Sequence, residues 1–230
     1  MAIALCALPA DARPPMQSLD STTAASGPLW FFRGQIGAGP LDRGTDIPGA
    51  VLNSGFVEGS DEYTNFVFAL TAMRGLRRWL AAGVQVGAVT NDLTMDSGHP
   101  PIGPQSFRIA SWPLLAQIEL GRADAPAPRI RPYVDLAAGV AIHTGKPRLH
   151  TSAIGTPVSL RARPGWMCEA AAGIDVFFAP SVAANLQAGW RRDAMRYTLG
   201  FNAAPSRSGE MILSQSCVRG GVTCAWTPGR

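Results

Sequence analysis

Few residues of this chain have the types and spacing that catalysis or metal binding requires. Among its 230 residues the only histidines are His99, His143 and His150, and none lies at the short spacing from another histidine or a cysteine that is typical of a metal site. His150-Thr151-Ser152 brings an imidazole and a hydroxyl close together, but this segment is predicted to be a loop. The many Gly-x-Gly pairs lie inside alternating segments rather than in a phosphate-binding loop. We therefore predict no catalytic residue, no cofactor-binding residue and no metal ligand.

A group of carboxylates is the strongest candidate for cation binding. The group lies in the first long connection and consists of Asp42, Asp46, Glu58, Asp61 and Glu62. Carboxylate oxygens suit calcium, or the cations that bridge lipopolysaccharide. A solvated acidic loop explains the same residues without a ligand, and we favour that interpretation.

The composition excludes several classes of protein. Hydrophobic residues make up 47% of the chain and charged residues only 16%, which argues against intrinsic disorder. The 25 glycines and 19 prolines argue against a helix bundle, and no apolar run approaches the roughly 18 residues of a spanning helix. The net charge of +4 is modest, and no arginine cluster is interleaved with aromatic residues. We therefore expect no nucleic-acid partner.

The strongest pattern is an alternation with a period of two, which is typical of β-strands. In residues 182–191, Val182, Leu186 and Trp190 share one face, and Asn185, Gln187 and Arg191 share the other. Eight segments follow this pattern, namely 30–38, 63–73, 80–89, 107–120, 133–142, 168–178, 182–191 and 195–202. Pro113 is expected at a bulge. The sequence thus predicts an all-β protein.

The connections between these segments differ in length. Residues 74–77, 179–181 and 192–194 form short connections and 121–128 a modest one, whereas 39–62, 91–106 and 144–165 are long. Short turns at one end and long loops at the other are typical of outer-membrane barrels. Two groups of aromatic residues are expected at the two membrane boundaries. The short-turn group is Trp30, Phe31, Trp79, Tyr133, Phe177, Phe178 and Phe201, and the long-loop group is Tyr63, Phe66, Phe107, Trp166 and Trp190.

Three stretches carry a resemblance to a known family. Arg131–Val140 resembles the PYxGxGxG strand of small bacterial outer-membrane β-barrel proteins, of the outer-membrane protein A transmembrane-domain-like and outer-membrane protein W-like superfamily. Residues 171–191 resemble the late hairpin of that family, and Tyr197–Phe201 resembles its closing strand. The resemblance implies an eight-stranded antiparallel up-and-down transmembrane β-barrel in the outer membrane of a Gram-negative bacterium. It also implies contact with membrane lipid and lipopolysaccharide, a monomeric state, and loops able to bind an unknown partner.

Four parts of the chain follow from this interpretation. Residues 1–12 are expected to be a truncated signal peptide, because an apolar stretch precedes the small-x-small site Ala10-Asp11-Ala12. Residues 13–28 would be an N-terminal periplasmic segment, 29–203 the barrel and 204–230 a C-terminal tail. Within the tail, Cys217 and Cys224 could form a disulfide in an oxidising periplasm or remain free thiols.

Three functions stay open at this point. An eight-stranded barrel has an interior that side chains can fill, which favours a non-enzymatic structural or loop-mediated interaction role. A lipid A acyl hydrolase of the same architecture would need a His-x-Ser-Asn motif on a late strand, but Ala153 follows Ser152 here. A soluble lipocalin-like carrier would need its apolar face turned inward.

The two faces of the strands lead to specific expectations. Val84, Leu136, Ile174, Leu186 and Leu199 are predicted to contact lipid. The inward charges are predicted to be Arg33, Glu119, Asp135, Glu169, Asp175, Arg191 and Arg196. A charge enclosed in a barrel is costly unless it is paired, so we expect one network that plugs the lumen. Arg191 should pair with Glu169 or Asp175, and the alternative is a set of separately solvated charges near the barrel ends.

Overall fold

The computed structural model describes residues 29–40, 57–58, 65–96, 105–123, 129–148, 159–201 and 204–227. The expected signal peptide and periplasmic segment, residues 1–28, lie outside the described residues. Nine strands are described: β1 (Trp30–Gly39), β2 (Val57–Glu58), β3 (Asn65–Arg77), β4 (Leu80–Asp96), β5 (Gln105–Gly121), β6 (Ile130–Arg148), β7 (Ser159–Ala179), β8 (Val182–Phe201) and β9 (Ala204–Trp226). No helix able to cross a membrane occurs in the part of the chain that the structure describes.

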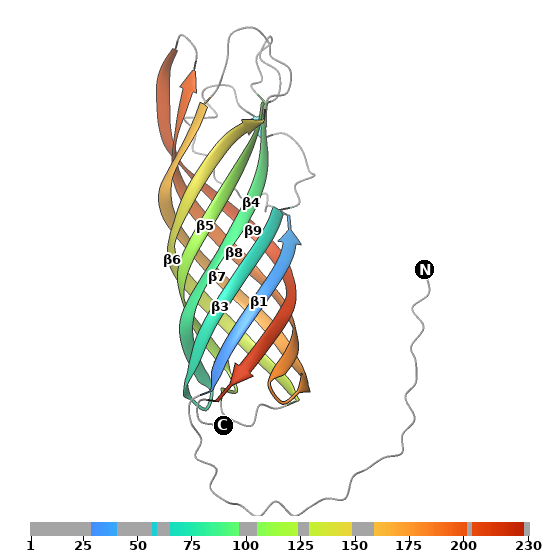
Figure 1. Ribbon diagram of the computed structural model, residues 1–230. Helices are drawn as coiled ribbons and strands as arrows, with labels where there is room; N and C mark the ends of the chain where they lie inside the picture. The colour runs from blue at the N-terminus through green and yellow to red at the C-terminus, as the bar shows by residue number, and fades with distance from the viewer. Residues whose placement is uncertain are drawn as a thin grey trace, which may run out of the picture.

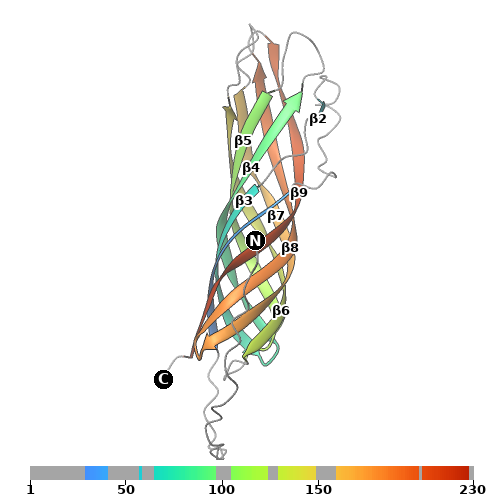
Figure 2. The ribbon, with the colours of Figure 1, turned by 90° about the vertical axis from the view of Figure 1, so that its right-hand side faces the viewer.

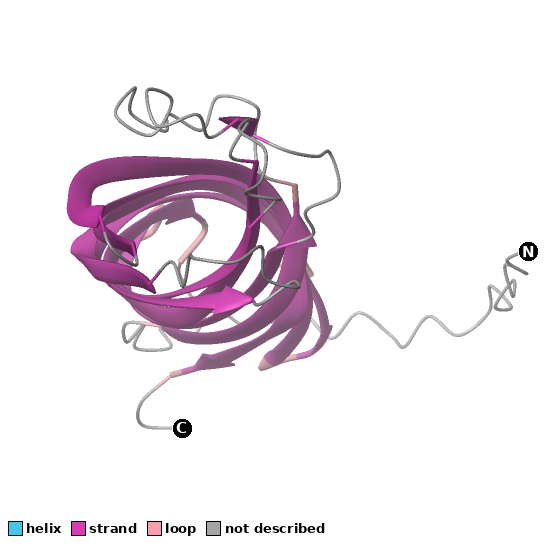
Figure 3. Cartoon of the chain, turned by 90° about the horizontal axis from the view of Figure 1, so that it is seen from above, coloured by secondary structure: helices cyan, strands magenta, loops and turns pink. Residues whose placement is uncertain are grey.

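Eight of these strands close into a barrel. The hydrogen-bonded order is β1, β3, β4, β5, β6, β7, β8 and β9, and β9 pairs antiparallel with β1 to complete the ring. The strands tilt around a tall barrel (Figure 1) and form a closed ring when seen from above (Figure 3). β2 only extends the sheet at the end of β4, where Val57 pairs with Asp96. The predicted eight-stranded antiparallel up-and-down barrel is confirmed.

The alternation sorts apolar side chains to the outside and polar ones to the inside. Val84, Leu136, Ile174 and Leu186 are exposed on the outer face, as predicted for the lipid contact, whereas the side chain of Leu199 lies outside the described residues. The inner face carries buried arginines, carboxylates and amides. A soluble lipocalin-like carrier requires the opposite arrangement, so that alternative is wrong.

The last two strands differ from the prediction. β8 continues through residues 192–194 without a turn, so that segments 182–191 and 195–202 form one strand. Residues 204–226, predicted to be a tail, form β9, the strand that closes the barrel. Because the alternation runs unbroken through β8, Met195 and Tyr197 point inward, and Arg196 is exposed rather than inside. The error arose because two arginines and an aspartate in a row were interpreted as a turn.

The strands also extend into the predicted loops. β4 and β5 include residues 91–96 and 105–106, and β6 and β7 include 144–148 and 159–165. The rest of these two connections, and residues 41–56 and 59–62 of the first, lie outside the described residues. The turns Arg78-Trp79 and Pro180-Ser181 are short, and both lie at the end of the barrel where the chain terminates (Figures 1 and 2). The connection between β8 and β9, residues 202–203, is also short but lies at the opposite end, so the division into short and long connections holds only in part.

The aromatic residues follow the alternation rather than a simple grouping by barrel end. Trp79 and Phe178 are exposed near the short turns, and Phe66, Trp166 and Trp190 are exposed elsewhere on the outer face. Phe31, Tyr133 and Phe177 were predicted at the membrane boundary but are buried inside, because they occupy inward positions of their strands. Tyr63 and the side chains of Phe107 and Phe201 lie outside the described residues.

The proline in β5 interrupts the sheet without a bulge. The pairing of β4 with β5 keeps one register on both sides of Pro113, from Val86↔Leu114 to Val89↔Ser111. The missing N–H of proline is accommodated by a local gap in the ladder. The expected bulge at Pro113 is therefore wrong. A bulge occurs instead in β7, between Arg163 and Trp166.

Candidate functional site: the charged interior of the barrel

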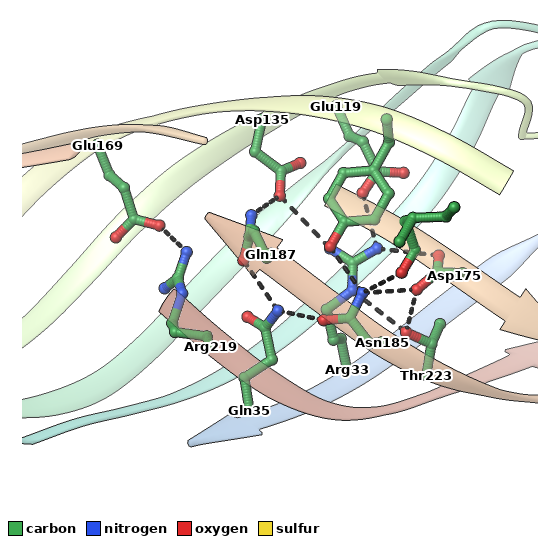
Figure 4. Close-up of polar contacts among 12 residues, drawn as sticks. Arg33, Gln35, Glu119, Asp135, Glu169, Asp175, Asn185, Gln187, Arg219 and Thr223 are labelled. Atoms are coloured by element: carbon green, nitrogen blue, oxygen red, sulfur yellow. Dashed lines mark hydrogen bonds and ion pairs between the residues drawn. The ribbon is translucent and has the colours of Figure 1, made fainter. Parts of the chain in front are cut away.

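Arg33 of β1 is the centre of the larger interior network (Figure 4). Its guanidinium lies 3.0 Å from Glu119 Oε2, 3.4 Å from Asp135 Oδ2 and 3.3 Å from Asp175 Oδ2. Its Nε donates to Thr223 Oγ1 at 3.2 Å. The four partners come from β5, β6, β7 and β9, so this one side chain connects distant parts of the ring. We call these residues, together with Arg131, the lower cluster.

Arg131 of β6 completes the lower cluster. It donates to Asp175 Oδ2 at 2.8 Å, to Glu119 and to the backbone carbonyl of Arg122. Its guanidinium lies over the ring of Phe31, 4.0 Å from the centroid, and that of Arg33 lies over Tyr133 at 4.1 Å. Two guanidiniums thus face three carboxylates, and buried aromatic rings supply further contacts to the cations.

Amide side chains extend this network across the lumen. Asn185 donates to Asp175 Oδ1 and to the hydroxyl of Tyr133, each at 2.7 Å, and Gln187 donates to Asp135 Oδ2 at 2.6 Å. Gln35 of β1 donates to Gln187 Oε1 at 2.8 Å. Figure 4 shows Gln35 of β1, Gln187 of β8 and Asp135 of β6 pointing toward one another.

A glycine makes room for part of this network. A Cβ on Gly173 would lie 2.4 Å from the ring of Tyr133, so only glycine lets that ring lie flat against β7. The ring position matters because the Tyr133 hydroxyl accepts from Asn185 and its face contacts Arg33. A similar approach occurs at Gly37, where a Cβ would lie 2.7 Å from Arg219 Cγ.

A second group, the upper cluster, is built around Glu169 of β7. Its Oε2 accepts from Arg191 Nη2 at 2.6 Å and from Arg191 Nε at 3.0 Å, and its Oε1 accepts from Arg219. The predicted pairing of Arg191 with Glu169 or Asp175 is confirmed, with Glu169 as the partner.

Ser111, His143 and Asp193 form a third group with the residue types of a hydrolytic triad but a different arrangement. Ser111 donates to Asp193 Oδ2 at 2.7 Å, and His143 Nε2 lies 2.8 Å from Asp193 Oδ1. His143 Nδ1 lies 3.1 Å from the carbonyl oxygen of Arg163. A nucleophilic serine needs a hydrogen bond to the histidine that takes its proton. Here both imidazole nitrogens have other partners, and the hydroxyl is held by the carboxylate, so the group does not have the arrangement of a Ser-His-Asp triad.

All but one of the predicted inward charges lie where they were expected. Arg33, Glu119, Asp135, Glu169, Asp175 and Arg191 are at most 5% exposed and take part in the interior networks. Arg196 is the exception, as described above. Sequence reasoning missed Arg131, Arg219, His143 and Asp193. Arg131 lies two residues before Tyr133 in β6, on the same inward face, so its position could have been predicted from the alternation. Arg219 could not, because it was assigned to the supposed tail.

The two cysteines considered for a disulfide lie on opposite faces of β9. Cys217 is buried inside, Cys224 is exposed outside, and both are free. Seven positions of one extended strand separate them by about 23 Å, which no disulfide spans. The disulfide is therefore excluded.

The candidates in the long connections are not tested by the structure. His99, His150, Ser152 and the acidic residues of the first connection lie outside the described residues, except that Glu58 lies in β2 without a described side chain. Among the residues that the structure describes, no group of three or more His, Cys, Asp or Glu side chains is arranged to hold a metal ion.

Comparison with known proteins gives a clear result at the level of fold. No family model matches the sequence, and no curated protein matches it. The outer membrane protein OprG from Pseudomonas aeruginosa superposes with a TM-score of 0.61 at 10% identity, over 88% of this chain and 97% of that one. The chain has the fold of the outer-membrane β-barrels.

Two further solved structures are similar at lower scores. Neisserial surface protein A matches with a TM-score of 0.44 at 13% identity, over 86% of this chain and 98% of that one. Outer membrane protein AlkL matches with a TM-score of 0.41 at 13% identity, over 96% of this chain and 98% of that one.

The outer face of this outer-membrane barrel agrees with a position in lipid. A closed barrel satisfies its backbone hydrogen bonds between strands, and an apolar outer surface is stable only where water is excluded. Large side chains such as Leu114, Leu136 and Leu186 are more than half exposed on that surface. The barrel therefore spans the outer membrane.

Proposed function

We propose that this chain is a non-enzymatic outer-membrane barrel whose lumen is closed by its own side chains. In this proposal it acts through its outer surface and through the connections at the end opposite the short turns. The observation that carries the proposal is the ion pair between Arg33 and Asp135. β1 and β6 are four strands apart in either direction around the ring of eight, so this pair crosses the lumen at its widest.

Further cross-lumen contacts support the same conclusion. Ser111 of β5 reaches Asp193 of β8, three strands away around the ring, and Gln35 of β1 reaches Gln187 of β8 past the intervening β9. An eight-stranded barrel has an interior that side chains can fill, and here the polar side chains bind one another at several levels. A pathway for a solute would require these bonds to break together.

The non-enzymatic part of the proposal rests on the third interior group. Asp193 engages both Ser111 and His143, so no described serine has a histidine as its base. The test is to incubate the purified, folded protein with lipid A in detergent and to measure released fatty acid. We expect no release above a heat-denatured sample. Release that is lost in a Ser152→Ala variant would contradict the proposal and support a hydrolase.

Closure of the lumen is tested separately by liposome swelling. Proteoliposomes should not swell faster than empty liposomes when they are placed in an isotonic solution of a small sugar. An Arg33→Ala/Asp135→Ala double variant removes the pair that crosses the lumen, and it serves as the comparison if it folds. Rapid swelling with the unaltered protein would overturn the proposed closure.

We also propose that the barrel is a monomer in contact with outer-membrane lipid and lipopolysaccharide, and that a partner binds at the connections. Large apolar side chains are exposed on every strand of the ring, which supports contact with lipid on all sides. Cross-linking of the folded protein in outer-membrane vesicles tests the monomeric state. A specific cross-linked dimer would contradict it.

A further inference from the structure

The upper cluster has more cationic groups than its carboxylate can satisfy. Glu169 accepts hydrogen bonds from both Arg191 and Arg219, so one carboxylate faces two guanidiniums. Figure 4 shows Arg219 reaching Glu169 at one side of the network. A buried charge is stable only when a counter-charge and hydrogen-bond partners are near it. The second guanidinium therefore lacks a carboxylate of its own.

Several donors in this cluster have no hydrogen-bond partner among the described residues. They are Arg191 Nη1, Arg219 Nε, Arg219 Nη1 and Gln215 Nε2. The three side chains belong to residues that are 1%, 1% and 3% exposed. Gln215 lies directly opposite Arg191 in the pairing of β8 with β9, and its Oε1 accepts from Asn65 at 3.1 Å, which leaves its NH₂ group available. Four N–H-bearing atoms thus belong to three neighbouring side chains, in a place where unsatisfied donors are costly.

The other interior carboxylates are engaged elsewhere. Asp193, the next inward residue of β8 after Arg191, binds Ser111 and His143 through its two oxygens. Asp135 is bound by Arg33 and Gln187 through Oδ2, whereas its Oδ1 has no hydrogen-bond partner among the described residues. Asp175 is bound by Arg33 and Arg131. The protein thus places its carboxylates in the lower cluster and around His143, and leaves the upper cluster with a cationic surplus.

The surroundings of the upper cluster favour a small ligand. Cys217 lies between Gln215 and Arg219 on the inner face of β9, and Ala137 is the cross-strand neighbour of Glu169. Both belong to an apolar cluster that also contains Leu115 and Met167. Apolar walls strengthen the attraction between an anion and the guanidiniums, and they exclude a large hydrated anion.

We propose that Arg191, Arg219 and Gln215 bind one small monovalent inorganic anion of the chloride class inside the barrel. The anion accepts from the free N–H groups and balances the second guanidinium. The site lies within the closed lumen and is separate from the surface at which the proposed function operates. If this site binds an anion, the stability of the folded protein depends on the type of anion in solution and not only on the ionic strength.

The direct test measures the ³⁵Cl line width of a chloride solution containing the refolded protein in a zwitterionic detergent. We expect excess broadening that bromide displaces, because a halide bound in a protein relaxes faster than a free one. Arg219→Gln should abolish that broadening. Arg196→Gln serves as the control, because it removes the same charge from the exposed face of β8 and should leave the broadening unchanged.

A second measurement covers the case in which Arg219→Gln does not fold. Gln215→Met removes one neutral donor and keeps every charge, and it should weaken chloride binding about tenfold, the equivalent of one hydrogen bond. In the unaltered protein the urea midpoint should be higher in sodium chloride than in sodium gluconate at the same ionic strength, because ligand binding stabilises the folded state. Equal midpoints in the two salts, or broadening that persists in Arg219→Gln, would overturn the proposal and show that water alone satisfies these donors.

Discussion

The charged side chains of the barrel interior lie next to opposite charges, and in the upper cluster one carboxylate is shared by two guanidiniums. Arg191 and Glu169 face each other on adjacent strands, and the arginine donates two hydrogen bonds to one carboxylate oxygen. Neither residue is more than 5% exposed, so water cannot replace a lost partner easily. Removing Arg191 breaks both hydrogen bonds to Glu169 Oε2, and only Arg219 then remains bound to that carboxylate.

Arg191→Ala is expected to lower the free energy of unfolding by about 3 kcal/mol, near the lower limit for a broken buried pair, because Arg219 still binds Glu169. Arg196→Ala is the matched control on the same strand, and its exposed side chain predicts a loss of less than about 1 kcal/mol. Urea titrations of the two variants in detergent make the comparison. Equal losses would show that the inward and outward assignments in β8 are wrong.

Asp175→Ala should be more damaging than Arg191→Ala. The Asp175 carboxylate accepts from Arg33, Arg131, Asn185 and Thr223, so its removal leaves four buried donors without this acceptor at once. We expect a loss of about 3–5 kcal/mol in the same titration. A stability equal to that of the unaltered protein would mean that solvent reaches the lower cluster.

At the scale of the strands, the period of two explains most of the fold. Residues such as Leu136 and Leu186 were assigned to the lipid face from alternation alone, and their exposure confirms the assignment. Each face of a strand meets one environment, so the polarity of every second residue shows directly in the sequence which face meets lipid and which meets the lumen.

Leu186→Arg is expected to cost about 2–4 kcal/mol, because the side chain faces the lipid well inside β8. Leu76→Arg provides the control. Leu76 is similarly exposed but lies next to the Arg78-Trp79 turn, where an arginine reaches the interface and costs at most about 1 kcal/mol. Folding yields in lipid vesicles across a urea series measure both. The lipid-face assignment fails if the two variants behave alike.

The strand boundaries could not be obtained from the sequence in the same way. The Arg192-Asp193-Ala194 segment has the composition of a turn, and only the contact of Asp193 with Ser111 and His143 explains why it continues a strand. β9 was taken for a tail because neither of its faces is uniform in polarity. Ser216 and Gly220 interrupt its apolar outer face, and Cys217 and Gly221 interrupt the inner face that carries Arg219. The pairing of Glu169 could be anticipated because β7 and β8 form a hairpin, whereas Arg33–Asp135 depends on ring closure.

Removal of β9 tests this correction. A chain that ends at residue 203 lacks the strand that joins β1 to β8, so both of those strands have unpaired edges in lipid. We expect no heat-modifiable band for this chain on unboiled gels. A chain that ends at residue 227 keeps all of β9 and should fold normally. Normal folding of the shorter chain would restore the interpretation of residues 204–230 as a tail.

At the scale of the whole molecule, the lengths of the connections predict which end faces the outside of the cell. The turns Arg78-Trp79 and Pro180-Ser181 lie at one end, and the connections across residues 97–104 and 149–158 lie at the other. Outer-membrane barrels have short periplasmic turns and longer extracellular loops. The two ends should therefore differ in their access from outside the cell.

An epitope tag inserted within residues 149–158 should bind antibody on intact cells, since loop tips tolerate insertions. The same tag placed between Arg78 and Trp79 should bind only after the outer membrane is opened. Flow cytometry with and without permeabilisation makes the comparison. Binding to the second tag on intact cells, without binding to the first, would invert the topology.

The central claim is that side chains close the lumen, because Arg33 meets Asp135 across the full width of the ring and amides join neighbouring levels. The most direct measurement is the ionic current through the refolded protein in a planar lipid bilayer. The cross-lumen network predicts insertion without steady, porin-sized current steps. Stable, long-lived steps of that size from the unaltered protein would contradict a closed lumen.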